Sequence, residues 1–391
     1  MDTAASAALK RTPLYDAHVA AGGRMVPFAG YEMPVQFKDG VLSEHKWTRQ
    51  HAGLFDVSHM GPCYLHLANK SGDDEADHKA ISAIIEPLIS GDIASLKPAQ
   101  IRYTVLLNQT GGMLDDLMVA RHVPQAAGSL YIVVNGATKE DDFQLIGEAA
   151  GEGAYLERAD DCALLALQGP EAEGVLAAFF PHAANLGFMT FAGGMWNGHC
   201  VMFSRSGYTG EDGYEILVPP EAAPAFYEAL LADARVKPIG LGARDSLRLE
   251  AGLPLYGHDA DETVSPIEAA LNFAVPKKRR EAGDLRGGDR LVKEFGGDLA
   301  RVRVGLRIPE GAPAREGAEI ADLNGKVIGK VTSGGFSPTL GQPIAMGFVP
   351  PALKAPGTRL NVIVRGKAQG AEVVAMPFVP HRYVRKSPAQ I

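Results

Sequence analysis

The sequence predicts an α+β fold followed by a smaller all-β domain, and three observations lead to this prediction. Through about residue 280, segments with the two-residue period of strands alternate irregularly with segments of helical period. No glycine-rich phosphate-binding loop is found, which disfavours a doubly wound parallel sheet. From about Arg301 onward, short strand-like runs are separated by Gly-Gly, Pro-Pro and Asn-Gly turns, a pattern typical of a small barrel or sandwich.

The expected elements of the larger part follow from period and turn chemistry. The first clear helix runs from Ser43 to Gln50, and Gly53 closes it because glycine readily adopts the backbone conformation that ends helices. Segments rich in β-branched and aromatic residues predict strands over 64–67, 102–107, 114–121 and 130–134. Helical spacing predicts helices over 139–150, 171–180 (which Pro170 opens), 221–234 and 243–251.

The character of the chain changes near the basic run Lys277–Arg280, which by itself is most simply a solvated linker. Strands are then expected over 301–307, 326–332, 345–349, 359–364 and 372–375. We therefore expect α+β structure over residues 1–280, a boundary over 281–298 and a β-barrel domain over 299–391. The acidic stretch 71–78 is expected to be a solvated loop.

Composition excludes several classes of function. The 391 residues carry 38 Lys and Arg against 46 Asp and Glu, a net charge of −8 that disfavours binding to nucleic acid. No apolar run reaches the length of a membrane span, and neither a secretion signal nor an Arg-rich presequence begins the chain. Three isolated cysteines form no disulfide framework, and the eleven histidines show no metal-ligand spacing. We expect a soluble intracellular protein without a metal.

Two adjacent aspartates follow the turn at Gly111 and Gly112. Along the strand predicted there, Asp115 and Asp116 point to opposite faces, and each has apolar residues on its own face. A carboxylate in such surroundings is either hydrogen-bonded for structure or functional with a shifted pKa. The spacing alone does not choose between the two aspartates.

A glycine-rich loop precedes a second candidate acid, Glu215. This glutamate lies inside a predicted strand and must find hydrogen-bond donors, either from a cross-strand Lys or Arg or from a ligand. Glu211 and Asp212 lie in the turn and are expected to be solvated.

Two arginines four residues apart, Arg244 and Arg248, share one side of a predicted helix. They repel each other unless an anion lies nearby. Salt bridges with Asp245 and Glu250 would satisfy them, and so would a ligand carboxylate, which an arginine fork binds in bidentate fashion.

A series of motifs spans almost the whole chain and resembles one family, the glycine cleavage T-proteins, which are tetrahydrofolate-dependent aminomethyltransferases. Each motif alone is weak, but their number, order and spacing make the resemblance specific. The motifs are Arg11–Tyr15, Phe28–Gly30, Phe55–Met60, Gly111–Leu117, Leu164–Pro170, Gly207–Gly213, Ala243–Gly252, Val331–Gly334 and Met376–Pro380.

This resemblance implies a fold, a reaction and a partner. The fold has three lobes, in which two interleaved α+β domains and a C-terminal β-barrel surround a central folate channel. The reaction transfers the methylene of an aminomethyl group, carried on the dihydrolipoyl arm of H-protein, to tetrahydrofolate. The products are 5,10-methylenetetrahydrofolate, ammonia and the reduced arm. Tetrahydrofolate is the co-substrate, and neither a metal nor a flavin nor a nicotinamide is implied. The location would be the bacterial cytoplasm, or the mitochondrial matrix if a presequence has been removed.

The resemblance also assigns roles to individual residues. The family's catalytic aspartate is the second of its pair, Asp116. Glu215 matches the glutamate that holds the pterin, and Arg244 and Tyr383 match further folate contacts. Other positions that match the channel lining are Asn135, Met60, Tyr103, Tyr208, Tyr256 and Arg382.

Relatives with other activities define the alternatives. Folate-dependent demethylases of small methylated substrates share the implied fold and much of the site. Non-catalytic folate-binding scaffolds carry a cysteine in a Lys-Gly-Cys-Tyr-type motif, where this chain has Arg205–Tyr208 without a cysteine. A further hypothesis is that the run Lys277–Arg280 steers an acidic H-protein to its docking site.

Overall fold

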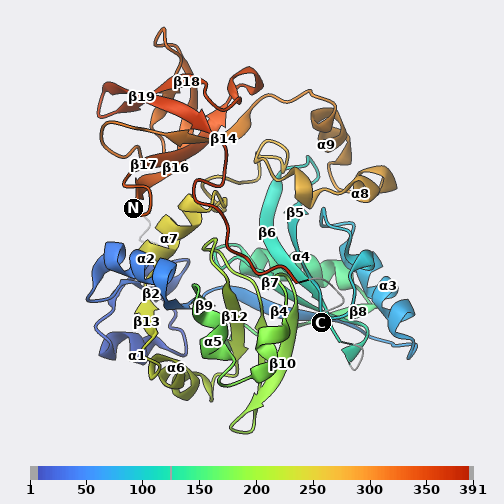
Figure 1. The fold of residues 1–391 in the computed structure, drawn as a ribbon. Coiled ribbons are helices and arrows are strands. Elements are labelled where there is room, and N and C mark those ends of the chain that lie inside the picture. Colours follow the sequence, from blue (N-terminus) through green and yellow to red (C-terminus); the bar gives the residue numbers. More distant parts are fainter. Residues whose placement is uncertain (1–7, 124–125, 387–391) are drawn as a thin grey trace, which may run out of the picture.

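Two β-sheets built from alternating parts of the chain form most of the molecule, and the computed structural model describes residues 8–123 and 126–386 (Figure 1). In the six-stranded sheet only β3 and β13 pair in parallel. Its strand order is β10 (Phe191–Trp196), β11 (His199–Ser204), β12 (Gly213–Val218), β9 (Ala163–Gln168), β3 (Ala52–Asp56) and β13 (Val236–Ile239). The second sheet has the order β5 (Ile101–Leu107), β6 (Met113–Arg121), β7 (Ser129–Val134), β4 (Gly61–Leu67) and β8 (Ala154–Arg158).

The two sheets are interleaved because the chain passes between them more than once. Residues 57–60 carry the chain from β3 to β4, and it returns from β8 to β9. Each sheet has its own apolar core, so neither sheet is a simple appendage of the other. Around the first sheet lie α1 (Tyr15–Ala20), the hairpin β1 (Arg24–Phe28) and β2 (Tyr31–Gln36), α2 (Gly40–Gln50), α5 (Ala172–Leu176), α6 (Ala223–Leu231) and α7 (Leu241–Glu250). The second sheet carries α3 (Asp74–Ile85) and α4 (Lys139–Ala150).

A closed six-stranded barrel completes the fold. Its strands are β14 (Val302–Arg307), β15 (Glu319–Ala321), β16 (Val327–Ser337), β17 (Gln342–Val349), β18 (Arg359–Val364) and β19 (Lys367–Val374). Short 3₁₀ turns occur at η1 (Ile93–Ser95), η3 (Pro181–Asn185), η4 (Asn272–Ala274) and η5 (Pro351–Leu353). The α+β class with a C-terminal barrel is therefore confirmed.

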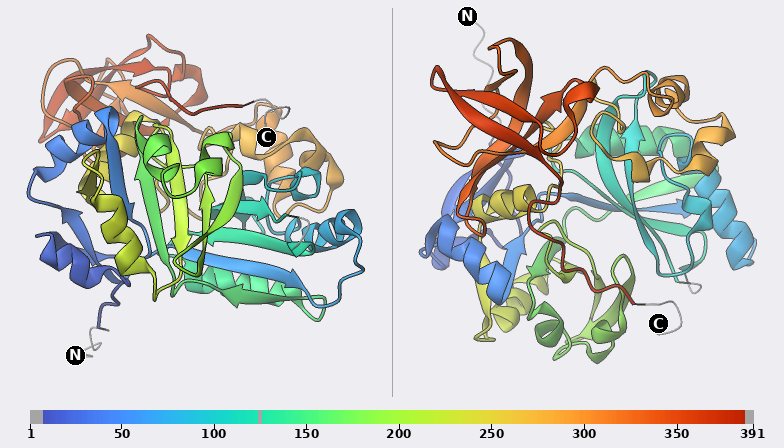
Figure 2. Two further views of the ribbon diagram at one scale, coloured as in Figure 1. Left: turned by 60° about the horizontal axis from the view of Figure 1, so that its bottom comes forward. Right: turned by 45° about the horizontal axis from the view of Figure 1, so that its top comes forward.

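The chain leaves the barrel and runs back across the first sheet (Figure 2). We call residues 376–386 the tail. Its backbone bonds the end of α7, where Val379 N donates to Glu250 O at 3.0 Å, and then the glycine-rich loop, where Arg382 N donates to Gly210 O at 2.8 Å. The tail thus holds the barrel against the rest of the molecule.

The expectation of a solvated loop over residues 71–78 is wrong. Helix α3 begins at Asp74, and the Asp73 carboxylate caps it by accepting the Ala76 N–H at 2.9 Å. Asp77 and His78 are buried. The acidic residues that looked like a solvated run are those that favour a helix N-terminus, where backbone N–H groups are unpaired.

The region from Lys277 to residue 298 is also more ordered than a solvated linker. It contains α8 (Lys277–Ala282) and α9 (Gly288–Phe295). Arg279 is buried, and its guanidinium donates to Asp284 at 2.9 Å and to the Glu86 carbonyl at 2.6 Å. Lys278 pairs with Asp92 at 2.8 Å. Arg279 is therefore held within the fold, whereas the side chains of Lys277 and Lys278 stay mostly exposed.

Candidate functional site

Asp116 stands near the start of β6, directly after a close-packed turn. A side chain at Gly112 would collide with the Glu262 carbonyl, which explains the glycine there. The Asp116 carboxylate accepts hydrogen bonds from Tyr103 Oη at 2.9 Å and from Asn135 Nδ2 at 2.9 Å. Burial raises the pKa of Asp116 above its ordinary value, although both bonds oppose this shift. Asp116 is therefore an oriented carboxylate that binds a proton more readily than a solvated aspartate.

Asp115 lies on the opposite, fully buried face of β6. Asn135 donates to it twice, from its backbone N at 2.8 Å and from Nδ2 at 2.7 Å, so one asparagine links both aspartates. Behind Asp115 lies Asp142 of α4, which is also buried. Burial raises the pKa of Asp142 to about 7. Both aspartates of the pair are thus tied into one network.

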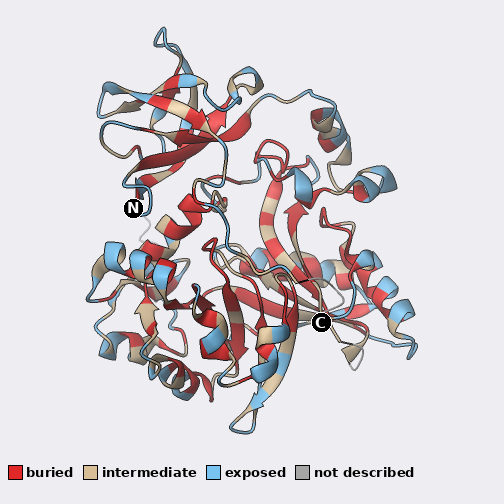
Figure 3. Ribbon diagram, viewed as in Figure 1, coloured by how far each residue is buried: buried red, intermediate tan, exposed pale blue. Residues whose placement is uncertain are grey.

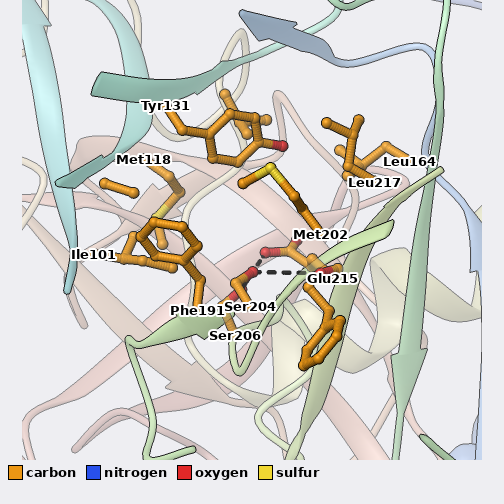
Figure 4. A pocket seen from close by; sticks show the side chains of 13 residues that line it. Ile101, Met118, Tyr131, Leu164, Phe191, Met202, Ser204, Ser206, Glu215 and Leu217 are labelled. Atoms are coloured by element: carbon orange, nitrogen blue, oxygen red, sulfur yellow. Dashed lines mark hydrogen bonds between the residues drawn. The ribbon is translucent and has the colours of Figure 1, made fainter. Parts of the chain in front are cut away.

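Glu215 lines a small cavity of about 30 Å³ between the two sheets (Figure 4). Its carboxylate accepts a hydrogen bond from Ser206 at 2.5 Å, and Ser204 bonds Ser206 at 2.7 Å. Neither a lysine nor an arginine is among the residues that line this cavity. The lining is otherwise mostly apolar and includes Ile101, Met118, Ala120, Tyr131, Val133, Leu164, Phe191, Met202, Phe203 and Leu217.

Arg244 on α7 presents an unsatisfied donor. Its guanidinium lies over the Tyr208 ring, 4.9 Å from the centroid. Its buried Nη1 has no hydrogen-bond partner among the residues that the structure describes. Burial lowers the pKa of Arg244, and the nearby negative charge of Glu215 partly offsets that shift. A desolvated donor of this kind is costly unless a ligand group pairs with it.

Comparisons with known proteins cover the same chain from end to end. Residues 14–279 match the family described as the GCVT N-terminal domain, and residues 301–380 match the glycine cleavage T-protein C-terminal barrel domain. The chain belongs to the glycine cleavage T-protein family. It is 45% identical to the mitochondrial aminomethyltransferase of Homo sapiens, covering 96% of this chain and 91% of that protein.

Two further relatives agree with this T-protein assignment. The probable mitochondrial aminomethyltransferase of Schizosaccharomyces pombe is 43% identical, covering 98% of this chain and 96% of that protein. The crystal structure of glycine cleavage system aminomethyltransferase T from Bartonella henselae superposes with a TM-score of 0.88 at 41% identity. That comparison covers 96% of this chain and all of the other. The predicted family is therefore confirmed, and the chain is an aminomethyltransferase by relationship.

The structure also bears on membrane and metal binding. Over residues 8–123 and 126–386, no helix is both long and apolar enough to cross a bilayer. Within the same described ranges, no three His, Cys, Asp or Glu side chains cluster in a way that could hold a metal ion.

Several residues that the T-protein motifs single out lie next to one another. Asp116 contacts Tyr103 and Asn135, and its negative charge adds to the burial that raises the pKa of Tyr208. Tyr208 in turn lies against Arg244. These residues connect the turn before Asp116 to the arginine on α7.

The remaining predicted residues lie around this group. Tyr256 Oη donates to the Met113 carbonyl at 3.2 Å. Tyr383 of the tail stacks on Phe188 with ring centroids 4.0 Å apart, and burial raises its pKa to about 12. Met60 packs against the apolar cluster behind the cavity.

Arg382 lies on the tail beside the loop that carries Glu211. Its guanidinium donates to the Arg49 carbonyl at 3.3 Å and lies 3.5 Å from Glu211, with about half of the side chain exposed. Arg382 thus serves first to anchor the tail.

Two sequence-based expectations about charges near the site are wrong. Glu211 and Asp212 are buried rather than solvated, because Arg49 pairs with Glu211 at 2.9 Å and Arg205 pairs with Asp212 at 2.6 Å. Arg49 is distant from Glu211 in the sequence, and Arg205 lies at the other end of the loop from Asp212. Spacing in the sequence therefore could not reveal the pairs.

Of the two salt-bridge partners considered for Arg248, Asp245 is confirmed and Glu250 is wrong. Arg248 binds Asp245 at 2.8 Å as expected, but its second partner is Asp259 at 2.8 Å. Glu250 instead binds Arg49 and His45. The family motif on α7 is therefore largely structural, apart from Arg244.

Sequence reasoning missed three kinds of residue at the site. It did not single out Ser206 as the donor to Glu215, although Ser206 lies in the same glycine-rich loop. It did not select Phe191 and Met202 for the cavity, although Met202 and Ser204 share one face of β11 by the two-residue period. It also missed Asp142, for which the sequence offers no signal because its partner Asp115 lies on another element.

Proposed function

We propose that this protein is the aminomethyltransferase that transfers a methylene group from the aminomethyl-dihydrolipoyl arm of lipoylated H-protein to tetrahydrofolate. The products would be 5,10-methylenetetrahydrofolate, ammonia and the reduced arm. The family assignment supports the glycine cleavage system as the setting. By analogy with relatives named mitochondrial, the reaction would occur in a mitochondrial matrix or, in a bacterium, in the cytoplasm.

The observation that carries the folate part of the proposal is the unsatisfied Nη1 of Arg244. A buried guanidinium donor without a partner calls for an acceptor, and carbonyl or carboxylate oxygens of a folate supply one. The aromatic ring of Tyr208 packs against one face of this guanidinium, so the guanidinium is oriented before a ligand binds.

Glu215 would hold the pterin head. A pterin presents a ring N–H beside an exocyclic amine, and these two donors match the two oxygens of one carboxylate. Among the described residues, the hydrogen bond to the Glu215 carboxylate comes from Ser206, and it is accepted by Oε2. The apolar walls contributed by Met118, Phe191 and Met202 suit the faces of a flat bicyclic ring.

Asp116 would act at the carbon being transferred. The substrate methylene lies between a sulfur and a nitrogen, so positive charge develops there as the folate nitrogen attacks and the amine leaves. A carboxylate held by Tyr103 and Asn135 stabilises that charge without reorganising. Its raised pKa also suits it to take up or pass on a proton as ammonia departs.

A reconstituted assay tests this function. Purified protein is mixed with tetrahydrofolate and with H-protein whose lipoyl arm carries the aminomethyl group, and ammonia and methylenetetrahydrofolate are followed together. We expect equal amounts of both products, with neither formed when tetrahydrofolate is omitted at the same concentration of enzyme. Turnover of small methylated amines with no reaction of loaded H-protein would instead identify a demethylase. Folate binding without any turnover would identify a non-catalytic scaffold.

A further inference from the structure

Two buried serines lie beside the carboxylate to which we assign the pterin. Ser204 ends β11 and Ser206 lies in the glycine-rich loop, and both line the same cavity as Glu215 (Figure 4). Ser204 and Glu215 face each other directly across β11 and β12, so their side chains share one face of the sheet. Three polar side chains therefore meet in a cavity whose lining is mostly apolar.

The hydrogen bonds within this group run in one direction. Ser206 Oγ donates to Glu215 Oε2 at 2.5 Å, and this bond uses the single hydroxyl hydrogen of Ser206 because an ionised carboxylate can only accept. The hydrogen bond of 2.7 Å between the two serine oxygens is then donated by Ser204. The other acceptor near Ser204, the Glu215 carbonyl, lies farther away at 3.5 Å. Two hydroxyl groups in series thus end on one carboxylate oxygen, and each strengthens the next.

The loop that carries Ser206 is itself held by a buried amide. Gln168 of β9 is fully buried, and its Nε2 donates to the Ser206 carbonyl at 3.0 Å. Its Oε1 accepts a hydrogen bond from Thr209 Oγ1 at 2.8 Å. A side chain at Gly207 would come within 1.9 Å of the same Oε1, so the loop packs directly on this amide. The backbone of Ser206 is therefore fixed, and its hydroxyl meets Glu215 from a set direction.

We propose that Ser206, with Ser204 behind it, is a positioning residue that fixes the Glu215 carboxylate before folate binds. The bond from Ser206 takes one of the about four lone-pair sites of the carboxylate and leaves the others for the two adjacent donors of a pterin. Ser206 thus acts through Glu215. This role rests on the proposed function, in which Glu215 holds the pterin, whereas the chain of hydrogen bonds follows from the contacts alone.

Fixing this carboxylate matters because a glutamate side chain has several rotatable bonds. Neither a lysine nor an arginine lines the cavity, so the lining offers no cation that would hold Glu215 in one direction. A carboxylate free to turn would lose that freedom when the ligand binds, and the loss would weaken affinity. A carboxylate already held by Ser206 avoids most of this cost.

Isothermal titration with tetrahydrofolate tests the role of the hydroxyl group. We expect S206A to raise the Kd about three- to tenfold, because the carboxylate must then be ordered by the ligand. S206T keeps a hydroxyl group and should stay within about twofold of the wild type, and S204A should fall between the wild type and S206A. Circular dichroism confirms that each variant is folded. An unchanged or lower Kd in S206A would overturn the proposal, as would a larger loss in S204A than in S206A.

The matched control is S82A. Ser82 is also fully buried, but its hydroxyl donates to the His78 carbonyl at 2.7 Å within α3 of the other sheet. Removing this hydroxyl should leave the Kd for tetrahydrofolate unchanged. A rise in S82A equal to that in S206A would show that loss of any buried hydroxyl weakens binding, and would contradict a specific role for Ser206.

A double-mutant cycle separates positioning from a general structural effect. If Ser206 acts through Glu215, adding S206A to E215A should change the Kd by less than about twofold, although S206A alone weakens binding. A loss of the same size in both backgrounds would show that Ser206 acts independently of Glu215 and would overturn the proposal.

Kinetics in the reconstituted assay distinguish this inference from the proposed function. S206A should raise the KM for tetrahydrofolate and keep kcat at saturating folate within about twofold, and the opposite pattern would contradict the role. A wild-type protein that binds tetrahydrofolate, shows the expected cycle and yet does not react with loaded H-protein would refute the transfer reaction and support the positioning role. A wild-type protein that does not bind tetrahydrofolate would refute both.

Discussion

At the level of single residues, the site depends on how each carboxylate is paired. Among the described residues, Asp116 and Glu215 accept side-chain hydrogen bonds only from uncharged donors, whereas Glu211 and Asp212 form ion pairs with arginines. The four acids look alike in the sequence. Their partners separate candidates for chemistry from residues that hold the loop in place.

The variant Asp116→Asn tests the catalytic assignment. It retains the shape and the hydrogen bond from Tyr103 but removes the negative charge that would stabilise the transferred carbon. We expect turnover to fall at least about a hundredfold, as when a preorganised electrostatic group is lost, with little change in folate affinity. Isothermal titration with tetrahydrofolate and the reconstituted assay measure the two effects separately. Turnover close to that of the wild type would rule out this role.

The variant Glu215→Ala tests the pterin contact. Losing two charge-assisted hydrogen bonds should weaken tetrahydrofolate binding by one or two orders of magnitude. The control Glu221→Ala removes an exposed glutamate just after the same strand, where it pairs with His199 at 3.4 Å. Its affinity should match that of the wild type. If Glu215→Ala binds folate normally, the pterin lies elsewhere.

At the level of elements, helix α7 joins the site to the barrel. Its first turns carry Arg244, and its last residue, Glu250, is buried between α2 and β16. Glu250 accepts hydrogen bonds from Arg49 at 2.8 Å and from Ser337 at 2.5 Å. The hydrogen bond from His45, with those from Ser337 and Arg49, keeps the pKa of Glu250 low, at about 2, despite burial. The direction of Arg244 therefore depends on contacts more than a helical turn away.

We predict that Glu250→Ala destabilises the protein strongly. It removes the carboxylate that binds both Arg49 and His45 and leaves Arg49 with Glu211 alone, and breaking a buried pair costs about 3–5 kcal/mol. The control Glu316→Ala removes an exposed pair with His258 and should change stability by less than about 1 kcal/mol. Urea unfolding followed by circular dichroism compares the two. Similar midpoints for both variants would show that the buried network contributes little.

At the level of the whole molecule, the barrel and the two sheets are held together by the tail and by α7. Buried residues fill both sheets and the side of the barrel that faces them, while exposed residues gather on the outer helices and loops (Figure 3). The candidate residues for chemistry lie on several elements, on β6, β12, α7 and the tail. Forming the site therefore requires the complete tertiary structure.

The stability of the whole molecule should depend on pH through Asp142. Its pKa is about 7 in the folded protein and about 4 when unfolded, so the folded state holds more protons between these values. The free energy of unfolding should therefore fall as pH rises from about 4 to 7, by up to about 1.4 kcal/mol per pH unit from this group. Urea unfolding at pH 5 and pH 7.5 should show a smaller fall in Asp142→Asn than in the wild type. Equal falls would contradict the prediction.

The prediction from sequence succeeded where the signal is local. Strand and helix periods located β5, β6, β7, α4 and five of the six barrel strands, all but β15, because burial of one face imposes those periods. The acidic run at Asp73–Asp77 was misjudged because charge alone does not separate a solvated loop from a helix N-terminus. The basic run Lys277–Arg280 was interpreted as a solvated linker, but Arg279 is buried and donates to the carbonyl of Glu86, which is distant in the chain.

By itself, the sequence determined the α+β class, the C-terminal barrel and the family, since these depend on periods, turns and motifs that each lie within a short segment. Only the tertiary structure decided which acids are paired, that Arg244 Nη1 lacks a partner among the described residues, and that Asp142 lies behind Asp115. The physical reason is that charge pairing and desolvation depend on distances across the fold. Residues such as Asp115 and Asp142 come from different elements, and no local pattern records that they meet.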